Sequence, residues 1–346
     1  MSKKVAALTS SLALALLGVA YRGASHIAEA SALACPAEEF CLWLPLVITG
    51  PGNTTPLPTP TPTRTSTPVG QTAVVAGAGD IACGAESNGG SCKQMATSDL
   101  LLTINPHRVL IFGDNAYEEG ALSDFQNFYH PSWGRVKSKT SPVPGNHDYG
   151  IDQEAYGYFT YFGAAAGDPA KGYYSYDLGQ WHLIALNSNC SRVGGCSAGT
   201  PQNVWLQNDL QAHPAACTLA YMHHPLWSSS SYSTLAVQPL VELLYDYGVE
   251  LYLAGHAHNY ERFARQTADG KSDPVFGLRE FVVGTGGRNF TRYGTILPNS
   301  EVRNSTTFGV LKLTLAPTQY TWQFVPIAGS SWSDGPVTEA CHGSHF

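Results

Sequence analysis

Five short polar clusters in the sequence combine residue types that bind metal cations. Each cluster supplies a carboxylate, an amide or an imidazole, which are oxygen and nitrogen ligands for divalent and trivalent ions. A carboxylate can bridge two cations, and neutral histidine and asparagine can complete the coordination of each. The pattern therefore predicts a site with two metal ions. The candidate ligands are Asp80, Asp114, Asn146, His223, His256 and His258.

Glycine directly precedes Asp80, Asp114, Asn146 and His256. We expect these glycines to let the backbone turn tightly, so that the next side chain points inward. Each cluster alone is a weak signal, because a Gly-Asp pair usually marks a turn and a lone histidine is usually structural. All five clusters in this order indicate a catalytic centre.

Each cluster follows a short apolar run that predicts a β-strand. Loops at the carboxyl ends of strands in an α/β sheet gather at one edge, so we expect the clusters to meet there. The predicted strands span residues 73–79, 108–112, 141–144, 217–222 and 249–254.

Helical and alternating patterns fill the remaining chain. The start of one helix is marked by Thr200, a good N-cap, and by Pro201, which suits the first helical position. Together the elements predict an α/β fold with helices outside the sheets. The predicted helices span 96–104, 201–212 and 235–247, and predicted antiparallel strands span 173–178, 181–187, 280–283, 308–315 and 320–325.

The ordered clusters resemble the calcineurin-like metallophosphoesterase superfamily, and within it the purple acid phosphatases, over about residues 73–326. The resemblance implies a four-layer α/β/β/α sandwich with a dinuclear metal centre. One metal would take Asp80, Tyr117 and His258, the other would take Asn146, His223 and His256, and Asp114 would bridge them. The matching motifs are Gly79-Asp80, Gly113-Asp114-Asn115-Ala116-Tyr117, Gly145-Asn146-His147-Asp148, His223 and Gly255-His256-Ala257-His258.

Tyr117 distinguishes this branch from most of the superfamily. Most metallophosphoesterases have the pattern Asp-x-His at the first motif, whereas this chain has Asp80-Ile81-Ala82 there. Tyr117 restores the missing ligand, and a phenolate prefers Fe(III). The resemblance therefore implies Fe(III) in the first site and divalent Fe, Zn or Mn in the second. An ordinary loop aromatic is the alternative interpretation of Tyr117.

Three further residues are candidates for catalysis. His147 is expected to contact the phosphoryl group or protonate the leaving oxygen, with Asp148 orienting its ring. Plant-type purple acid phosphatases carry a histidine pair about nine residues beyond the ligand matching His223, whereas this chain has Trp, Ser and Tyr residues over 227–232. His224 is the candidate replacement. The alternative is a histidine turned outward or packed under the rim.

The expected reaction is hydrolysis of a phosphate monoester. Two cations within about 4 Å of each other lower the pKa of a bound water, generate a metal-bound hydroxide and offset phosphoryl charge during in-line attack. A phosphodiesterase or nucleotidase shares all five motifs and is the alternative. A non-catalytic cell-surface module would be expected to lack ligands, and no predicted ligand is missing.

The composition excludes several classes of protein. The 346 residues are 43% hydrophobic, so the chain can bury a large core and is not disordered throughout. The formal net charge is −7 and no basic run occurs beyond the first few residues, so we expect no nucleic-acid partner. The expected partner is a small phosphorylated substrate. The sequence does not indicate an oligomeric state.

Residues 1–34 are typical of a secretory signal peptide. Lys3 and Lys4 precede an apolar stretch over 5–20, and Ala-x-Ala sites follow. A permanent membrane anchor is the alternative, but a spanning helix needs roughly 20 apolar residues, so we expect no membrane span. We therefore expect a secreted or extracytoplasmic protein. Its parts are the signal peptide, a short Cys-containing apolar segment (35–49), a Thr/Pro-rich linker (50–71) and a catalytic domain (72–346).

Eight cysteines in an exported chain predict disulfides rather than zinc ligands, because no Cys-x-x-Cys pair occurs. Sequence alone does not determine their connectivity. Proximity suggests the pairs Cys35–Cys41, Cys83–Cys92 and Cys190–Cys196, which leaves Cys217 and Cys341 to close the C-terminal tail onto the domain.

Overall fold

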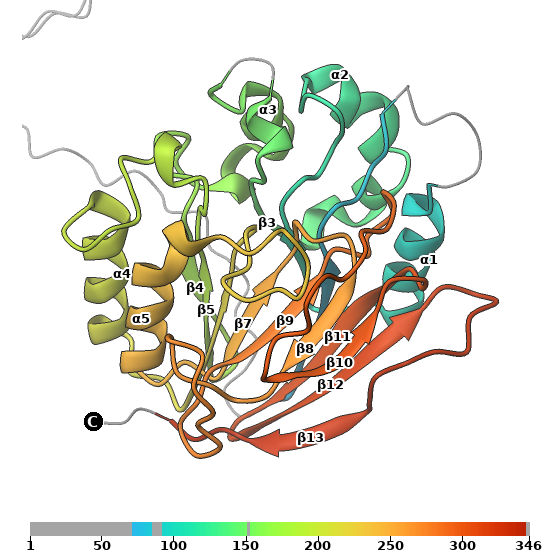
Figure 1. The fold of residues 1–346 in the computed structure, drawn as a ribbon. Coiled ribbons are helices and arrows are strands. Elements are labelled where there is room, and N and C mark those ends of the chain that lie inside the picture. Colours follow the sequence, from blue (N-terminus) through green and yellow to red (C-terminus); the bar gives the residue numbers. More distant parts are fainter. Residues whose placement is uncertain (1–70, 85–91, 151–152, 344–346) are drawn as a thin grey trace, which may run out of the picture. The chain divides into compact units, whose positions relative to one another are not determined.

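The computed structural model describes residues 71–84, 92–150 and 153–343 (Figure 1). Two β-sheets lie in the middle and helices cover their outer faces, which confirms the predicted α/β/β/α sandwich. The predicted signal peptide, the apolar segment 35–49 and the linker up to residue 70 lie outside the described residues. Within the described residues, no helix is both long and apolar enough to cross a membrane.

The first sheet has the strand order β13-β12-β11-β1-β2-β3. Its members β1, β2 and β3 run parallel, and its other neighbours are antiparallel. The parallel strands are almost wholly buried, as expected for strands covered on both faces. The strands are β1 (Ala73–Ala78), β2 (Arg108–Phe112), β3 (Thr140–Val143), β11 (Gly309–Ala316), β12 (Gln319–Pro326) and β13 (Val337–Ala340).

The second sheet has the order β10-β8-β9-β7-β6-β5-β4. Four consecutive members, β9, β7, β6 and β5, run parallel. The sequence pattern predicted β5 and β9 as antiparallel strands, whereas each of them has one parallel and one antiparallel neighbour. The remaining pairs are antiparallel. The strands are β4 (Tyr174–Leu178), β5 (Trp181–Ala185), β6 (Cys217–Tyr221), β7 (Leu251–Ala254), β8 (Tyr260–Phe263), β9 (Arg279–Val283) and β10 (Ser300–Asn304).

Helix α1 packs against the first sheet, and α4 and α5 pack together beside the second (Figure 1). As predicted, α4 begins at Pro201, but the Thr200 hydroxyl donates to the Ser197 carbonyl at 2.7 Å instead of capping the helix. The helices are α1 (Gln94–Ile104), α2 (Leu122–Asp124), α3 (Tyr156–Phe162), α4 (Pro201–Ala212) and α5 (Gln238–Asp246).

The largest apolar core contains side chains from both sheets. Leu110 of the first sheet and Leu183, Leu219 and Leu253 of the second are at most 1% exposed. Burying one such side chain contributes about 1.5–3 kcal/mol. This core fixes one sheet against the other, and so it also fixes the loops at the ends of their strands.

All three disulfides predicted for the catalytic domain are present: Cys83–Cys92, Cys190–Cys196 and Cys217–Cys341. Cys35 and Cys41 lie outside the described residues. The third bridge spans 124 residues and joins the start of β6 to the residue after β13. It therefore ties the C-terminal tail to the strand that leads to His223.

Replacing both Cys217 and Cys341 by alanine should lower the free energy of unfolding by about 2–4 kcal/mol, because a long loop is released in the unfolded chain. Denaturant unfolding measures the change. The matched control removes Cys190–Cys196, which spans only six residues and should cost less. Equal or smaller loss from the Cys217–Cys341 pair would contradict its anchoring role.

Candidate metal centre

The predicted ligands lie directly after the carboxyl ends of five strands. Asp80, Asp114, His223 and His256 each lie two residues beyond the end of β1, β2, β6 and β7, and Asn146 lies three residues beyond β3. The His256 backbone N–H donates to the Asp80 carboxylate at 2.8 Å, which links the two sheets at this edge. The five clusters therefore meet as the sequence predicted.

Three of these residues have a left-handed backbone. The φ angles are 61° at Asp80, 49° at Asp114 and 66° at His256. Such angles are uncommon outside glycine and cost of order 1–3 kcal/mol each. Packing of the surrounding loops therefore maintains conformations that a free chain would avoid.

The glycines before the ligands are needed chiefly for close packing. A Cβ atom on Gly145 would lie 2.1 Å from Asp114 Oδ1, and one on Gly113 would lie 2.5 Å from His223 Nδ1. Gly113 also has a positive φ of 79°. These glycines leave room for ligand side chains from neighbouring loops, whereas much of the unusual backbone geometry falls on the ligand residues themselves.

Four side chains converge in the first half of the site. The Tyr117 hydroxyl lies 2.9 Å from Asp80 Oδ1, 3.0 Å from Asp114 Oδ2 and 3.1 Å from His258 Nε2. His258 Nδ1 donates to Asn289 Oδ1 at 2.6 Å, so its Nε2 is free to offer a lone pair. One hydroxyl proton cannot serve three acceptors. Separations of about 3 Å suit atoms that share a cation at roughly 2 Å.

Four side chains also converge in the second half. His223 Nε2 lies 3.1 Å from Asn146 Oδ1, 3.2 Å from His256 Nδ1 and 3.3 Å from Asp114 Oδ1. His223 Nδ1 donates to the Phe112 carbonyl at 2.8 Å, so Nε2 of the neutral ring is an acceptor facing other acceptors. Asp114 contributes one carboxylate oxygen to each half of the site.

The pKa values explain why this cluster suits cations. Burial, together with the neighbouring His223, lowers the pKa of His256 to about 4. Burial disfavours charge on His223 too, but Asp114 and Asp80 outweigh it and raise that pKa to about 9. Burial and the same carboxylates raise the pKa of Tyr117 well above its ordinary value. A phenolate and a neutral His223 both require positive charge nearby, so the donor set fits two cations.

His147 lies at the edge of the same cluster. Its ring packs against Tyr117 with centroids 4.5 Å apart, and its Nε2 lies 4.0 Å from Asp114 Oδ2. Its Nδ1 donates to the Glu118 carbonyl at 2.6 Å. That hydrogen bond fixes the orientation of the ring and leaves Nε2 as the reactive nitrogen.

Asp148 does not orient His147, so that prediction is wrong. The Asp148 carboxylate is buried and accepts hydrogen bonds from the Asn115 backbone and side-chain amides and from the Gly145 N–H at 2.7–3.3 Å. These donors belong to the loops that follow β2 and β3. Asp148 therefore holds the loop that carries Asn146.

His224 faces the site, which contradicts the alternative of an outward-turned ring. Its ring centroid lies 4.4 Å from that of His256 and 4.8 Å from that of His223. Ser188 Oγ lies 2.8 Å from His224 Nδ1 and also accepts the His224 backbone N–H at 2.9 Å. Burial lowers the pKa of His224 well below its ordinary value, so the ring is neutral near pH 7.

Two buried glutamates that the sequence analysis missed hold loop 225–229. Glu280 of β9 accepts two backbone N–H groups of this loop at 3.1 and 3.2 Å, and Glu261 of β8 accepts that of Ser229 at 2.8 Å. Burial raises the pKa of Glu280 well above its ordinary value. An acidic residue beside an apolar strand run was the available signal, because a buried carboxyl needs hydrogen-bond partners.

Arg288, Glu118 and Asn289 were also missed. The Arg288 guanidinium lies 4.8 Å from the centre of the Tyr117 ring and pairs with the Glu118 carboxylate. The side-chain oxygen of Asn289 accepts the hydrogen bond from His258 Nδ1. Nothing in the sequence pattern marks these residues, because their partners lie on loops far away in the chain.

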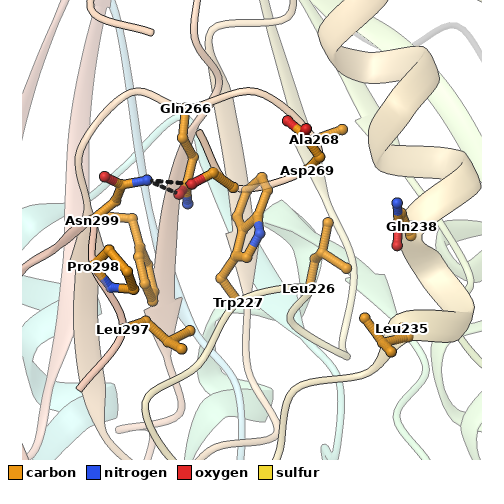
Figure 2. A pocket seen from close by; sticks show the side chains of 12 residues that line it. Leu226, Trp227, Leu235, Gln238, Gln266, Ala268, Asp269, Leu297, Pro298 and Asn299 are labelled. Carbon is orange, nitrogen blue, oxygen red and sulfur yellow. Dashed lines mark hydrogen bonds between the residues drawn. The ribbon is translucent and has the colours of Figure 1, made fainter. Parts of the chain in front are cut away.

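A cavity of about 460 Å³ opens beside the second half of the site, with Asn146 and His224 in its wall. Another cavity, of about 440 Å³, is lined by Trp227, Gln266 and mostly apolar neighbours (Figure 2). It includes none of the predicted ligands or catalytic residues. The cavity beside Asn146 is therefore the candidate substrate pocket.

A model of the calcineurin-like phosphoesterase family matches residues 79–260, more than half of the chain. The chain therefore belongs to the calcineurin-like phosphoesterase family. The proteins it resembles include purple acid phosphatases, the branch that its motifs predicted.

Three relatives from Arabidopsis thaliana illustrate the similarity. The chain is 31% identical to purple acid phosphatase 23 over 207 residues, which make up 49% of this chain and 44% of that one. It is 28% identical to purple acid phosphatase 15 over 224 residues, 54% and 41% of the two chains. A probable inactive purple acid phosphatase 1 is 27% identical over 247 residues, 60% and 38% of the two chains. The chain spans less than half the length of these relatives.

Two solved structures share the fold. The purple acid phosphatase PPD1 from yellow lupin (Lupinus luteus) seeds has a TM-score of 0.68 at 20% identity, covering 80% of this chain and 55% of that one. GAP50, the anchor in the inner membrane complex of Plasmodium, has a TM-score of 0.57 at 16% identity, covering 79% and 89%. At these identities the likeness concerns the fold alone.

The contrast between Asp148 and His147 is testable. Asp148→Ala should weaken metal binding by about 10–100-fold, because it releases the loop that carries Asn146. His147→Ala should retain both metals and lose on the order of 10²–10⁴ in the rate of phosphate-ester hydrolysis. Metal titration of the apoprotein and steady-state kinetics separate the two effects.

The matched control is Asp246→Ala, which removes an exposed acid at the end of α5. This variant should change neither the metal affinity nor the rate of phosphate-ester hydrolysis. If Asp148→Ala instead kept full metal affinity and reproduced the rate loss of His147→Ala, Asp148 would be acting through the His147 ring after all.

Proposed function

We propose that this protein is a secreted phosphatase that hydrolyses phosphate monoesters at a dinuclear metal centre. The proposal rests on the placement of the Asp114 carboxylate. One of its oxygens lies among the candidate ligands around Tyr117, and the other lies among those around His223. Membership of the phosphoesterase family supports phosphate-ester hydrolysis. Secretion is supported by the three disulfides and by the signal peptide predicted at residues 1–34.

The proposed first site holds Fe(III) through Asp80, Tyr117 and His258. A divalent Fe, Zn or Mn ion would occupy the second site. The Tyr117 hydroxyl supports this assignment, because it is buried among the atoms that would share the ferric ion. When bound, the two cations would supply positive charge for the phosphoryl oxygens and acidify the attacking water. The proposed ligands of the second site are Asn146, His223 and His256, with Asp114 bridging both.

The roles proposed for the chain's own residues follow from their hydrogen bonds. His147 donates from Nδ1 to Glu118, so a protonated ring can donate from Nε2 to the leaving oxygen. His224 is held at Nδ1 by Ser188 and is neutral, which suits it to contact a phosphoryl oxygen rather than to act as an acid. Asp148 positions the Asn146 loop and takes no part in proton transfer.

The preference for a monoester is supported by the candidate substrate pocket. The cavity that has both Asn146 and His224 in its lining has a volume of about 460 Å³, which suits one small leaving group. The second ester substituent of a diester would need additional space beside the phosphorus atom. A monoester places charged oxygens there instead, next to the metal ligands.

The activity should depend on Asp114. The wild-type protein should hydrolyse p-nitrophenyl phosphate faster than bis(p-nitrophenyl) phosphate, and Asp114→Ala should abolish turnover because both halves of the site lose a ligand. Elemental analysis should show metal loss in the same variant, and Asp246→Ala should behave like the wild type. A diester preference would contradict the monoester proposal, and a fully active, metal-loaded Asp114→Ala protein would show that the catalytic site is elsewhere.

Tyr117 provides a spectroscopic test of the ferric site. The oxidised wild-type protein should show a tyrosinate-to-iron charge-transfer band in the visible region, and its pH optimum should be acidic because a ferric ion acidifies bound water strongly. Tyr117→Phe should abolish the band while the other six ligands still bind metal. A colourless wild-type enzyme, active with two divalent metals at alkaline pH, would contradict the ferric assignment and leave the phosphatase proposal intact.

A further inference from the structure

We propose that Arg192 is a specificity-determining residue that binds a second anionic group on the substrate's leaving group. The inference rests on the proposed phosphatase function and names its substrate class. That class is phosphate monoesters whose leaving group carries a carboxylate or a second phosphate.

The candidate substrate pocket connects the metal centre to Arg192. The same cavity of about 460 Å³ has Asn146, His224 and Arg192 in its lining. Among the described residues that line it, Arg192 is the sole cation and none is acidic. An anionic group entering this cavity therefore meets one positive charge and no carboxylate in the lining.

The Arg192 guanidinium has hydrogen-bonding capacity to spare. It is exposed to solvent, and its side-chain hydrogen bond within the described residues goes to the neutral oxygen of Gln153. The guanidinium lies 5.9 Å from the centre of the Tyr149 ring, so the ring supports one of its faces. A guanidinium has five N–H donors, and carboxylates and phosphates bind such groups in bidentate fashion.

The backbone that carries Arg192 is fixed relative to the metal centre. The disulfide Cys190–Cys196 closes its loop, and the Arg192 N–H donates to the Asn189 carbonyl at 2.8 Å. The buried Asn189 side chain in turn donates to the Pro144 carbonyl at 3.1 Å, in the loop that carries the ligand after β3.

Tyr149 is anchored in the same way. Its hydroxyl accepts a hydrogen bond from Asn187 Nδ2 at 2.9 Å, and Asn187 is held through its backbone by Gln202 of α4 at 2.7–2.8 Å. The positions of the Arg192 backbone and of the Tyr149 ring relative to the candidate metal centre are therefore set by the folded chain. Such preorganisation reduces the entropy lost on binding and makes these positions a selective feature.

The test compares three substrates with similar aromatic leaving groups: phenyl phosphate, 4-carboxyphenyl phosphate and 1,4-phenylene bisphosphate. Arg192→Gln should raise KM about tenfold for the substrates with a second anion, because a charge-assisted hydrogen bond is lost, and should change their kcat less than about twofold. Phenyl phosphate should be unaffected. Arg192→Lys should retain part of the discrimination, because it keeps the charge without the bidentate geometry.

The matched control is Arg108→Gln, which removes the same charge at the amino end of β2, away from the metal centre. It should change no KM value. An effect of Arg192→Gln on only one anionic substrate supports the proposal and identifies the anion. Equal losses with all three substrates, or none with either anionic substrate, would overturn it. An unchanged thermal midpoint for Arg192→Gln shows that the variant is folded.

Equilibrium binding separates this proposal from the function on which it rests. Calorimetry with the metal-loaded protein compares phenylphosphonate with 4-carboxyphenylphosphonate and with 1,4-phenylenebisphosphonate. Wild-type protein should bind at least one of the two compounds with a second anion more tightly than phenylphosphonate, and Arg192→Gln should remove that difference. If the protein hydrolyses none of the esters, the proposed function fails while the binding comparison still tests Arg192. Equal binding of all three phosphonates by the wild type contradicts the role of Arg192.

Discussion

Both halves of the candidate metal centre share the carboxylate of Asp114. One oxygen lies among the acceptors around Tyr117 and the other faces His223, and the second oxygen also accepts the His147 backbone N–H at 2.9 Å. A buried carboxylate so placed must be balanced by positive charge, and the surrounding histidines lower its pKa in spite of its burial. The positions of the other candidate ligands follow from the need to surround this one group.

The fold places the candidate ligands around Asp114 by means of strained backbone conformations and a set of buried acidic side chains. Asp80, Asp114 and His256 adopt left-handed conformations. Buried carboxylates then hold the loops by accepting backbone N–H groups: Asp148 holds the loop after β3, and Glu280 holds the loop after β6. Loops that leave a sheet lose their regular hydrogen-bond partners, and a carboxylate can replace several at once. Acidic side chains here act as structural acceptors as well as candidate metal ligands.

In the proposed function, substrate selection and chemistry are divided between different loops. The residues proposed for catalysis, His147 and His224, are held by Glu118 and Ser188. The proposed anion-binding residue, Arg192, lies on a separate disulfide-closed loop that shares a cavity with the centre. Changes in that loop can therefore alter which leaving group fits without displacing a candidate ligand. This arrangement agrees with the general tendency of α/β folds to place function on loops and stability in the sheets.

The sequence by itself determined the types, order and strand-end positions of the candidate ligands, and the resemblance of its motifs to a known family implied the α/β/β/α architecture. These features are local, because a strand and the polar residues after it occupy one short stretch of chain. Only the tertiary structure decided which side chains contact one another. His256 meets Asp80 across 176 residues, Asp148 binds Asn115 and Gly145 instead of its neighbour His147, and Arg192 enters the candidate substrate pocket. Such contacts depend on how the sheets pack and how loops from distant strands meet, and no short stretch of sequence encodes that geometry.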